Sequence, residues 1–165
     1  MQLSQFNQSP LQDLLEHCVK IPRWAEEIMT ARPFDPKQAI VDFAQKQAQT
    51  WKWDEVLHAL NTHPRIGEKK AQADLSAKEQ AFSAREQATA QADQQTLDLI
   101  LQGNIAYEKR FGYIFLIKAA GLSSQEILKA LQARLNNNAH TEQEIVKQQL
   151  IGIALLRLEQ ELAHD

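Results

Sequence analysis

The sequence has a single cysteine, Cys18, among its 165 residues. An intramolecular disulfide is therefore excluded, and the chain suits a reducing compartment without requiring one. We interpret Cys18 as a thiol of the core, because no base lies near it in the sequence. No set of His, Cys, Asp and Glu residues has the spacing of a zinc site, so we expect no metal.

Long runs of one residue kind are also missing. No apolar run approaches the roughly 20 residues needed to cross a bilayer, and Met1 to Pro10 lack the regions of a signal peptide. We therefore expect a cytoplasmic protein that does not enter a membrane. The formal net charge is -3 and no extended basic stretch occurs, so we expect no nucleic-acid binding. A Gly-rich phosphate loop, a nucleophile elbow and a dinucleotide fingerprint are absent as well.

Glycine is scarce, with five residues, while Ala, Leu, Gln, Glu and Lys are abundant. This composition favours helix throughout, and the length suits one domain with one core. We find neither an internal repeat nor a linker. The sequence predicts an all-α fold, a single-domain bundle of about eight helices over residues 1–165.

Capping and proline patterns predict where these helices begin and end. Leu97, Ile100, Leu101, Ile105 and Ala106 are expected to form the apolar side of a helix that ends at Phe111-Gly112. Tyr113 to Ala120 has a strand-like composition, but no second strand is available to pair with it, so we interpret it as a buried helix. Helix starts are predicted at Ser9-Pro10, Pro22, Asp35-Pro36, Ser76 to Glu79, Ser123 to Glu126 and Thr141 to Glu144.

The candidate for chemistry is His63, which precedes Pro64. A residue before proline is disfavoured in the α region, so a helix through Trp51 to Leu60 should end at about His63. The helix dipole would then favour the protonated imidazole. Further along, Ser83, Glu86 and Gln87 stand at i, i+3 and i+4 and would share one helix face. An imidazole facing a hydroxyl, a carboxyl and an amide would form a small-molecule site.

Simpler interpretations of the same residues exist. A histidine before a proline is more often a cap or a surface residue. Glu86 would then be a solvated helix residue, and Ser83 a small residue on the same surface. From these residues alone, the chain is a helical domain with one candidate pocket.

Several motifs, in order along nearly the whole chain, together resemble one family. These are Arg32-Pro33-Phe34, His63-Pro64-Arg65-Ile66-Gly67, Ser83-x-x-Glu86-Gln87, Asn104-x-x-Tyr107-x-x-Arg110-Phe111-Gly112-Tyr113-x-Phe115, Arg134-Leu135-Asn136 and Leu156-Arg157-Leu158. The chain resembles the OHCU decarboxylases, or 2-oxo-4-hydroxy-4-carboxy-5-ureidoimidazoline decarboxylases, of urate degradation. The fold this implies is an all-helical single domain.

The resemblance also implies an activity and a site. The substrate would be the ureidoimidazoline produced by two earlier steps of urate breakdown, and the product (S)-allantoin. By position, His63 matches the catalytic histidine, and Arg134 stands where an arginine could bind a substrate anion. Lys118 departs from a segment that is mostly small or apolar in relatives. The positions that would contact substrate are Pro64, the segment Ser83, Ala84, Arg85, Glu86 and Gln87, and the segment Phe115, Leu116, Ile117, Lys118 and Ala119.

The implied reaction explains these residue types. Loss of carbon dioxide leaves electron density that the conjugated ring can delocalise, so we expect no cofactor. The protein must orient the substrate and deliver a proton to one face. We expect His63 to be the general acid/base, Glu86 to bind ureido N–H groups or hold the imidazole, and Ser83 and Gln87 to fix ring atoms. Backbone N–H groups on a first helical turn at Phe115 would bind negative charge.

Other readings remain open at this point. A non-catalytic helical interaction module would use the same surface to bind a partner helix, and would show an apolar groove without convergent polar groups. A related isomerase or hydrolase on the same scaffold is a third. Members of the family often form dimers, so a homodimer is a further expectation.

Overall fold

The computed structural model describes residues 1–66 and 94–163. Eight α-helices and no strand occur in these ranges, which confirms the all-α prediction. The chain divides into two compact units, Met1–Ala59 with Ile151–Asp165, and Leu60–Leu150. The helix start predicted at Ser76 to Glu79 and the helix expected to carry Ser83, Glu86 and Gln87 lie outside the described residues.

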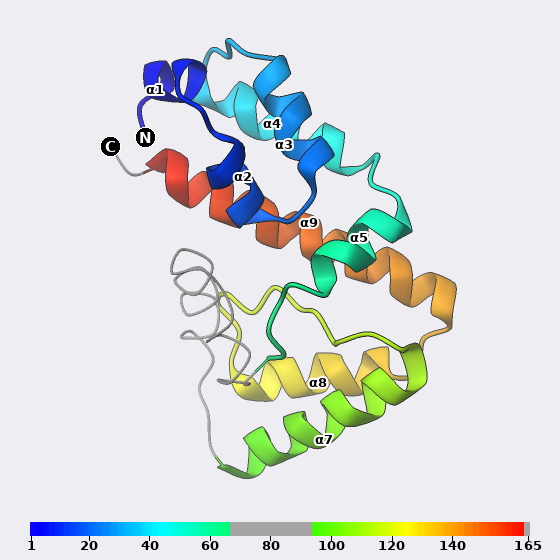
Figure 1. Ribbon diagram of the computed structural model, residues 1–165. Helices are drawn as coiled ribbons and strands as arrows, with labels where there is room; N and C mark the ends of the chain where they lie inside the picture. Colours follow the sequence, from blue (N-terminus) through cyan, green and yellow to red (C-terminus); the bar gives the residue numbers. More distant parts are fainter. Residues whose placement is uncertain (67–93, 164–165) are drawn as a thin grey trace. The chain divides into compact units, whose positions relative to one another are not determined.

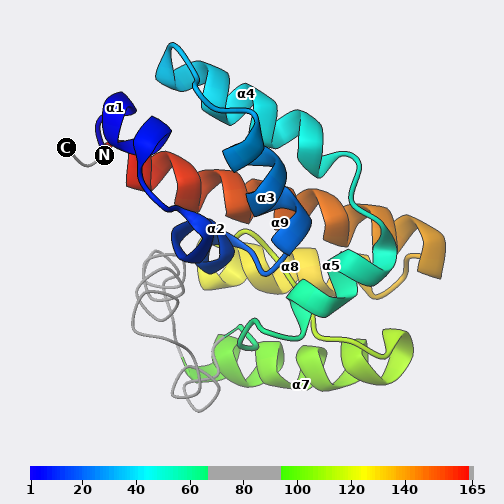
Figure 2. The same ribbon diagram turned by 45° about the horizontal axis from the view of Figure 1, so that its top comes forward.

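The first unit contains short helices followed by longer ones, and α3 packs against both α2 and α4 (Figures 1 and 2). Trp24 is fully buried on α3, and its indole N–H donates to the Ala44 carbonyl at 3.1 Å. The Trp51 ring meets it edge-on. Cys18 is buried too, as the sequence predicted. The helices are α1 (Leu3–Gln8), α2 (Gln12–Cys18), α3 (Pro22–Thr30), α4 (Lys37–Ala48), α5 (Trp53–Leu60) and the last part of α9 (Ala139–Ala163).

The turn Arg32-Pro33-Phe34 connects α3 and α4 to α1. The Arg32 guanidinium donates to the carbonyls of Phe6 and Ser9. The Asn7 side chain exchanges two hydrogen bonds with the backbone of Phe34, at 2.8 and 2.9 Å. This motif therefore has a structural role within the first unit.

Two helix starts in this unit differ from the prediction. Ser9 is not an N-cap but the C-cap of α1, a helix absent from the predicted set, and α2 begins only at Gln12. Because Phe6 is the one buried residue of α1, the sequence of this helix shows no periodic apolar pattern from which it could be predicted. At the next start, Pro36 and not Asp35 occupies the N-cap of α4. The start of α3 at Pro22 is confirmed.

In the second unit, α7 (Gln94–Phe111) and α8 (Ser124–Arg134) lie side by side (Figure 1). Gly103 permits this approach, since a Cβ atom there would lie 2.5 Å from the Leu131 side chain. The predicted ends are confirmed. Gly112 follows α7 with φ at 86°, and Ser123 caps α8 in a capping box with Glu126.

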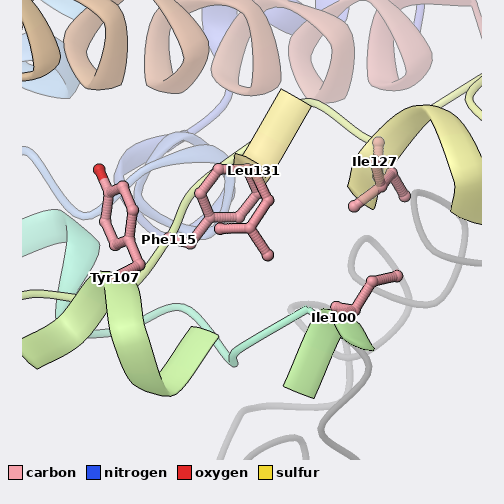
Figure 3. Close-up of a cluster of buried hydrophobic side chains, with 6 residues drawn as sticks. Ile100, Tyr107, Phe115, Ile127 and Leu131 are labelled. Atoms are coloured by element: carbon pink, nitrogen blue, oxygen red, sulfur yellow. The ribbon is translucent and has the colours of Figure 1, made fainter. Parts of the chain in front are cut away.

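A buried cluster joins these two helices to the segment between them (Figure 3). Ile100 and Tyr107 come from α7, and Ile127 and Leu131 from α8. Phe115, from the connecting segment, fills the space near Leu131 (Figure 3). This cluster is the core on which the candidate site is built.

Three predictions for this unit are wrong. Leu97, Leu101 and Ile105 are exposed on α7, and Ala106 is exposed as well, whereas Thr96, Ile100, Asn104 and Tyr107 are buried. The helix α9 begins at Ala139, two residues before Thr141, whose N–H is accepted by the Asn138 side chain. The buried helix expected over Tyr113 to Ala120 is absent: residues 114–119 form neither helix nor strand.

Candidate functional site

The turn that carries His63 follows α5 directly. α5 ends at Leu60, and the His63 N–H donates to the Leu60 carbonyl at 3.1 Å. His63 is half-buried and Pro64 is buried. The sequence correctly predicted that the helix ends just before this histidine, so the imidazole is carried by a turn at a helix C-terminus.

Arg65 and Ile66, which follow Pro64, are hydrogen-bonded to side chains of α7. Arg65 donates from Nε and Nη2 to the two carboxylate oxygens of Glu108, at 2.8 and 2.7 Å. The Asn104 amide donates to the Ile66 carbonyl at 3.3 Å, and the Ile66 side chain packs against the buried cluster. The His63-Pro64 turn therefore continues into a segment of defined position in the second unit.

A cleft of about 520 Å³ lies along this part of α7. Arg65, Ile66 and Asn104 line it together with the exposed apolar residues Leu97, Leu101 and Ile105, and His63 is not among its lining residues. Asn104 is 3% exposed, and its Oδ1 has no hydrogen-bond partner in the described parts of the chain. The cleft thus combines apolar side chains with one buried amide and with the charged residues Arg65, Asp98 and Glu108.

The segment Phe115 to Ala119 has no regular secondary structure, and Phe115, Leu116 and Ala119 are buried, Ile117 half-buried and Lys118 exposed. Side chains bind its backbone where a sheet would otherwise do so. Arg134 Nη1 donates to the Leu116 carbonyl at 2.7 Å, and the Lys118 N–H donates to Gln149 Oε1 at 2.8 Å. These contacts bind backbone groups that a helix would otherwise pair, and no strand lies beside the segment in residues 1–66 and 94–163.

Arg134 is held by the carboxylate of Glu142, a residue not predicted as part of the site. Its Nε and Nη2 donate to Glu142 Oε2 at 2.9 and 2.6 Å. The two side chains are 9% and 0% exposed. The guanidinium carbon also lies 4.4 Å from the centre of the Phe115 ring. Arg134 thus links α9 to the segment expected to contact substrate.

Two further donors complete the surroundings of Glu142. The Tyr107 hydroxyl donates to Oε2, and the Asn137 amide donates to Oε1 at 3.1 Å. The sequence did contain a signal for this buried acid. Glu142, Val146 and Leu150 follow at i, i+4 and i+8, and all three are buried, so the carboxylate belongs to an otherwise apolar stripe of α9.

Burial keeps the neighbouring tyrosines protonated. It is the main cause that raises the pKa of Tyr107 far above its usual value, and the hydrogen bond to Glu142 adds to it. Burial also raises the pKa of Tyr113. Both phenols therefore act as neutral groups in the cluster at physiological pH.

The structure thus describes part of the predicted site. His63, Pro64, Phe115 to Ala119 and Arg134 all belong to the second unit. Ser83, Ala84, Arg85, Glu86 and Gln87 lie outside the described residues, so their relation to His63 stays a prediction. Among residues 1–66 and 94–163, no group of three or more His, Cys, Asp or Glu residues could hold a metal ion. No helix in those ranges is long and apolar enough to span a membrane.

Comparison with known proteins gives a family that agrees with the motifs. The model of the OHCU decarboxylase family matches residues 4–159. The chain belongs to the OHCU decarboxylase family. Its members include a curated 2-oxo-4-hydroxy-4-carboxy-5-ureidoimidazoline decarboxylase of Haloferax volcanii, which is 25% identical over 153 residues; the match covers 93% of this chain and 87% of that protein.

Another relative is the Uric acid degradation bifunctional protein TTL of Arabidopsis thaliana, 30% identical over 146 residues. The match covers 86% of this chain but only 44% of the Arabidopsis protein, so the chain spans less than half of that relative. A crystal structure of OHCU decarboxylase in the presence of (S)-allantoin has a TM-score of 0.76 and 25% identity, and covers 92% of this chain and 98% of that one. The helical fold is therefore that of an OHCU decarboxylase.

Proposed function

We propose that this chain decarboxylates 2-oxo-4-hydroxy-4-carboxy-5-ureidoimidazoline to (S)-allantoin in urate degradation, without a cofactor. Family membership over residues 4–159 supports this activity, as does the likeness to a structure obtained in the presence of (S)-allantoin. One structural observation carries the proposal furthest. The turn after His63-Pro64 and the segment Phe115 to Ala119 pack against the same buried cluster, through Ile66 and Phe115.

The reaction breaks the bond between the ring carbon and its carboxylate. The electron pair left behind forms a double bond to the neighbouring ring carbon, which bears the ureido group, and the imine electrons move onto its nitrogen. The hydroxyl group of the resulting enol then loses its proton and becomes the ring carbonyl, while a proton is added to one face of the ureido-bearing carbon. A group that both accepts and donates protons near neutral pH suits this step, and His63 is that group in the described turn. Glu86 would bind the ureido N–H groups or hold the imidazole, while Ser83 and Gln87 would fix ring polar atoms.

The non-helical conformation changes the role we propose for Phe115 to Ala119. A first helical turn at Phe115 is not available to bind negative charge, because residues 114–119 are not helical. We propose instead that single backbone N–H and C=O groups of this segment bind the substrate, beside Pro64 and residues 83–87. Three of its backbone groups are already engaged: the Lys118 N–H donates to Gln149, and the carbonyls of Leu116 and Ala119 accept from Arg134 and from the Leu122 N–H.

The remaining proposals concern the whole protein. We propose that residues 1–165 act as one domain, in the cytoplasm, and that the chain forms a homodimer. Leu101 and Ile105 are 60% and 62% exposed on α7, and a second copy would bury such apolar surface. The same exposed stripe favours the alternative function, a module that binds a partner helix.

The histidine assay separates these functions. Freshly generated substrate is supplied to the wild type, to His63→Ala and to His58→Ala, a control in which an exposed histidine of α5 is removed. We expect His63→Ala to lower kcat by about a hundredfold or more, typical of a lost general acid/base, and His58→Ala to match the wild type. A correctly folded His63→Ala protein that still formed (S)-allantoin at the wild-type rate would exclude the proposed role.

A further inference from the structure

One buried arginine holds the N-terminal part of the segment Phe115 to Ala119, which is neither helix nor strand. Arg134 Nη1 holds the Leu116 carbonyl at 2.7 Å, and the guanidinium covers the Phe115 ring. No strand pairs with this segment in the described residues. A side-chain anchor of this kind fixes both the position of the backbone and the direction of the Leu116 carbonyl.

The arginine is in turn held by Glu142. This carboxylate is fully buried and binds the Nε and Nη2 side of the guanidinium, which leaves Nη1 directed at Leu116. A planar guanidinium can make both contacts at once, whereas the compact charge of a lysine cannot reproduce this fork. Tyr107 and Asn137 donate to the same carboxylate and fix its orientation.

We propose that Glu142 and Arg134 are positioning residues, which set the backbone of Phe115 to Ala119 and thereby the affinity for substrate. This inference rests on the proposed function, since it assumes that the segment contacts the ureidoimidazoline. It assigns Arg134 a different role from the direct anion ligand that the resemblance suggested. The nitrogens of its guanidinium are engaged by Glu142 and by Leu116, so it acts on substrate through the segment it holds.

A positioning role predicts a change in substrate affinity with little change in the chemical step. We expect Arg134→Lys to raise KM, and the Kd for (S)-allantoin, about tenfold, as for the loss of one hydrogen bond to a charged group. The value of kcat should stay within about threefold, because His63 is untouched. Tyr107→Phe, which removes one donor to Glu142 and keeps the aromatic ring, should raise KM by a smaller factor.

The first unit supplies a matched control. Arg23 also binds a glutamate through Nε and Nη2 and donates to a backbone carbonyl, that of Thr50. Arg23→Lys makes the same chemical change away from the candidate site, and should leave both KM and the Kd for (S)-allantoin at wild-type values. Steady-state kinetics and calorimetric titration with (S)-allantoin give the two constants.

The double variant distinguishes positioning from direct contact. If Arg134 acts through the network around Glu142, the effects of Arg134→Lys and Tyr107→Phe on KM will be non-additive. Additive effects, or a folded Arg134→Lys protein with wild-type KM and Kd, would overturn the inference. If Arg134→Lys fails to fold, Tyr107→Phe alone tests the inference. A Tyr107→Phe protein with the KM and the Kd of the wild type would then overturn it. A wild type without decarboxylase activity would instead overturn the proposed function.

Discussion

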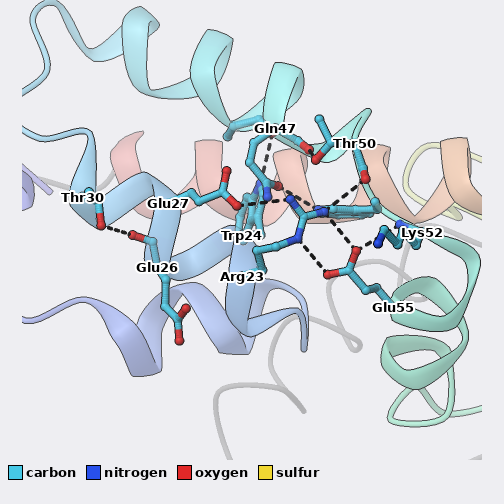
Figure 4. Close-up of polar contacts among 11 residues, drawn as sticks. Arg23, Trp24, Glu26, Glu27, Thr30, Gln47, Thr50, Lys52 and Glu55 are labelled. Carbon is cyan, nitrogen blue, oxygen red and sulfur yellow. Dashed lines mark hydrogen bonds and ion pairs between the residues drawn. The ribbon is translucent and has the colours of Figure 1, made fainter.

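Two arginines in this protein make nearly the same contacts in different surroundings. Arg23, in the first unit, binds both oxygens of Glu55 at 3.1 and 3.0 Å and donates to the Thr50 carbonyl (Figure 4). Arg134, in the second unit, binds Glu142 and the Leu116 carbonyl. The side chains of the first pair are 38% and 23% exposed, and those of the second 9% and 0%.

The difference in exposure determines what each pair contributes. A pair in contact with water typically adds about 0–1 kcal/mol, because water screens the charges and replaces the contacts. Breaking a buried pair leaves an uncompensated charge in the interior and costs about 3–5 kcal/mol. The exposed Arg23–Glu55 pair therefore adds little stability to the first unit, whereas the buried Arg134–Glu142 pair stabilises the interior of the second unit at the candidate site.

The largest effect should come from the buried carboxylate. We expect Glu142→Gln to lower the free energy of unfolding by about 3–5 kcal/mol, because Arg134 loses its counterion in the interior. Urea denaturation followed by circular dichroism measures this change. A loss below about 1 kcal/mol would show that the buried pair behaves like the surface pair, and the contrast between the two regions would fail.

Alkaline pH should weaken the second unit through Tyr107. Its folded pKa is raised, chiefly by burial, so its contribution is fully present below the unfolded pKa of about 10 and is lost as pH rises above it. From pH 10 to 11 this one tyrosine should remove about 1 kcal/mol of stability. Thermal or urea unfolding measured from pH 10 to 11 should show that the free energy of unfolding falls less steeply with pH in Tyr107→Phe than in the wild type. If the two proteins lost stability equally steeply with pH, the burial assigned to Tyr107 would be contradicted.

The smallest effect should come from the surface pair. The hydrogen bond from Arg23 is the first cause that lowers the pKa of Glu55. The stability that this hydrogen bond adds is therefore present above the pKa of Glu55 in the unfolded chain, about 4.5. It is lost as the pH falls through the lower pKa of Glu55 in the folded protein. Glu55→Gln should cost about 0–1 kcal/mol at neutral pH, and less in high salt. The same urea denaturation measures this loss of stability. If Glu55→Gln lost about as much stability as Glu142→Gln, the exposed and the buried pair would not differ as proposed.

The sequence predicted those parts of the fold that local chemistry controls. Gly112 ends α7 because only glycine readily adopts its positive φ, and Ser123 with Glu126 caps α8. The end of α5 before His63-Pro64 follows from the steric effect of proline. Such signals depend on a few adjacent residues, so they can be detected without a structure.

The wrong predictions depend on contacts distant in sequence. Tyr113 to Ala120 is not helical, and side chains from α8 and α9, Arg134 and Gln149, bind its backbone instead. No local pattern at Phe115 contains that information. The partners of Glu142 are distant as well, since Tyr107 and Arg134 lie 35 and 8 residues away in the sequence. The segment Thr141 to Glu144 was therefore predicted only as the start of the last helix. The role of Glu86 stays a prediction, because it lies outside the described residues.

The stereochemistry of the product tests the proposed function most directly. Spontaneous decay of the ureidoimidazoline adds the proton to either face, whereas an enzyme that delivers it from one side must yield one enantiomer. Circular dichroism of allantoin, formed from fresh substrate with and without the protein, distinguishes these cases. We predict (S)-allantoin in excess and formed faster than the background. Racemic allantoin formed at the spontaneous rate would contradict the account.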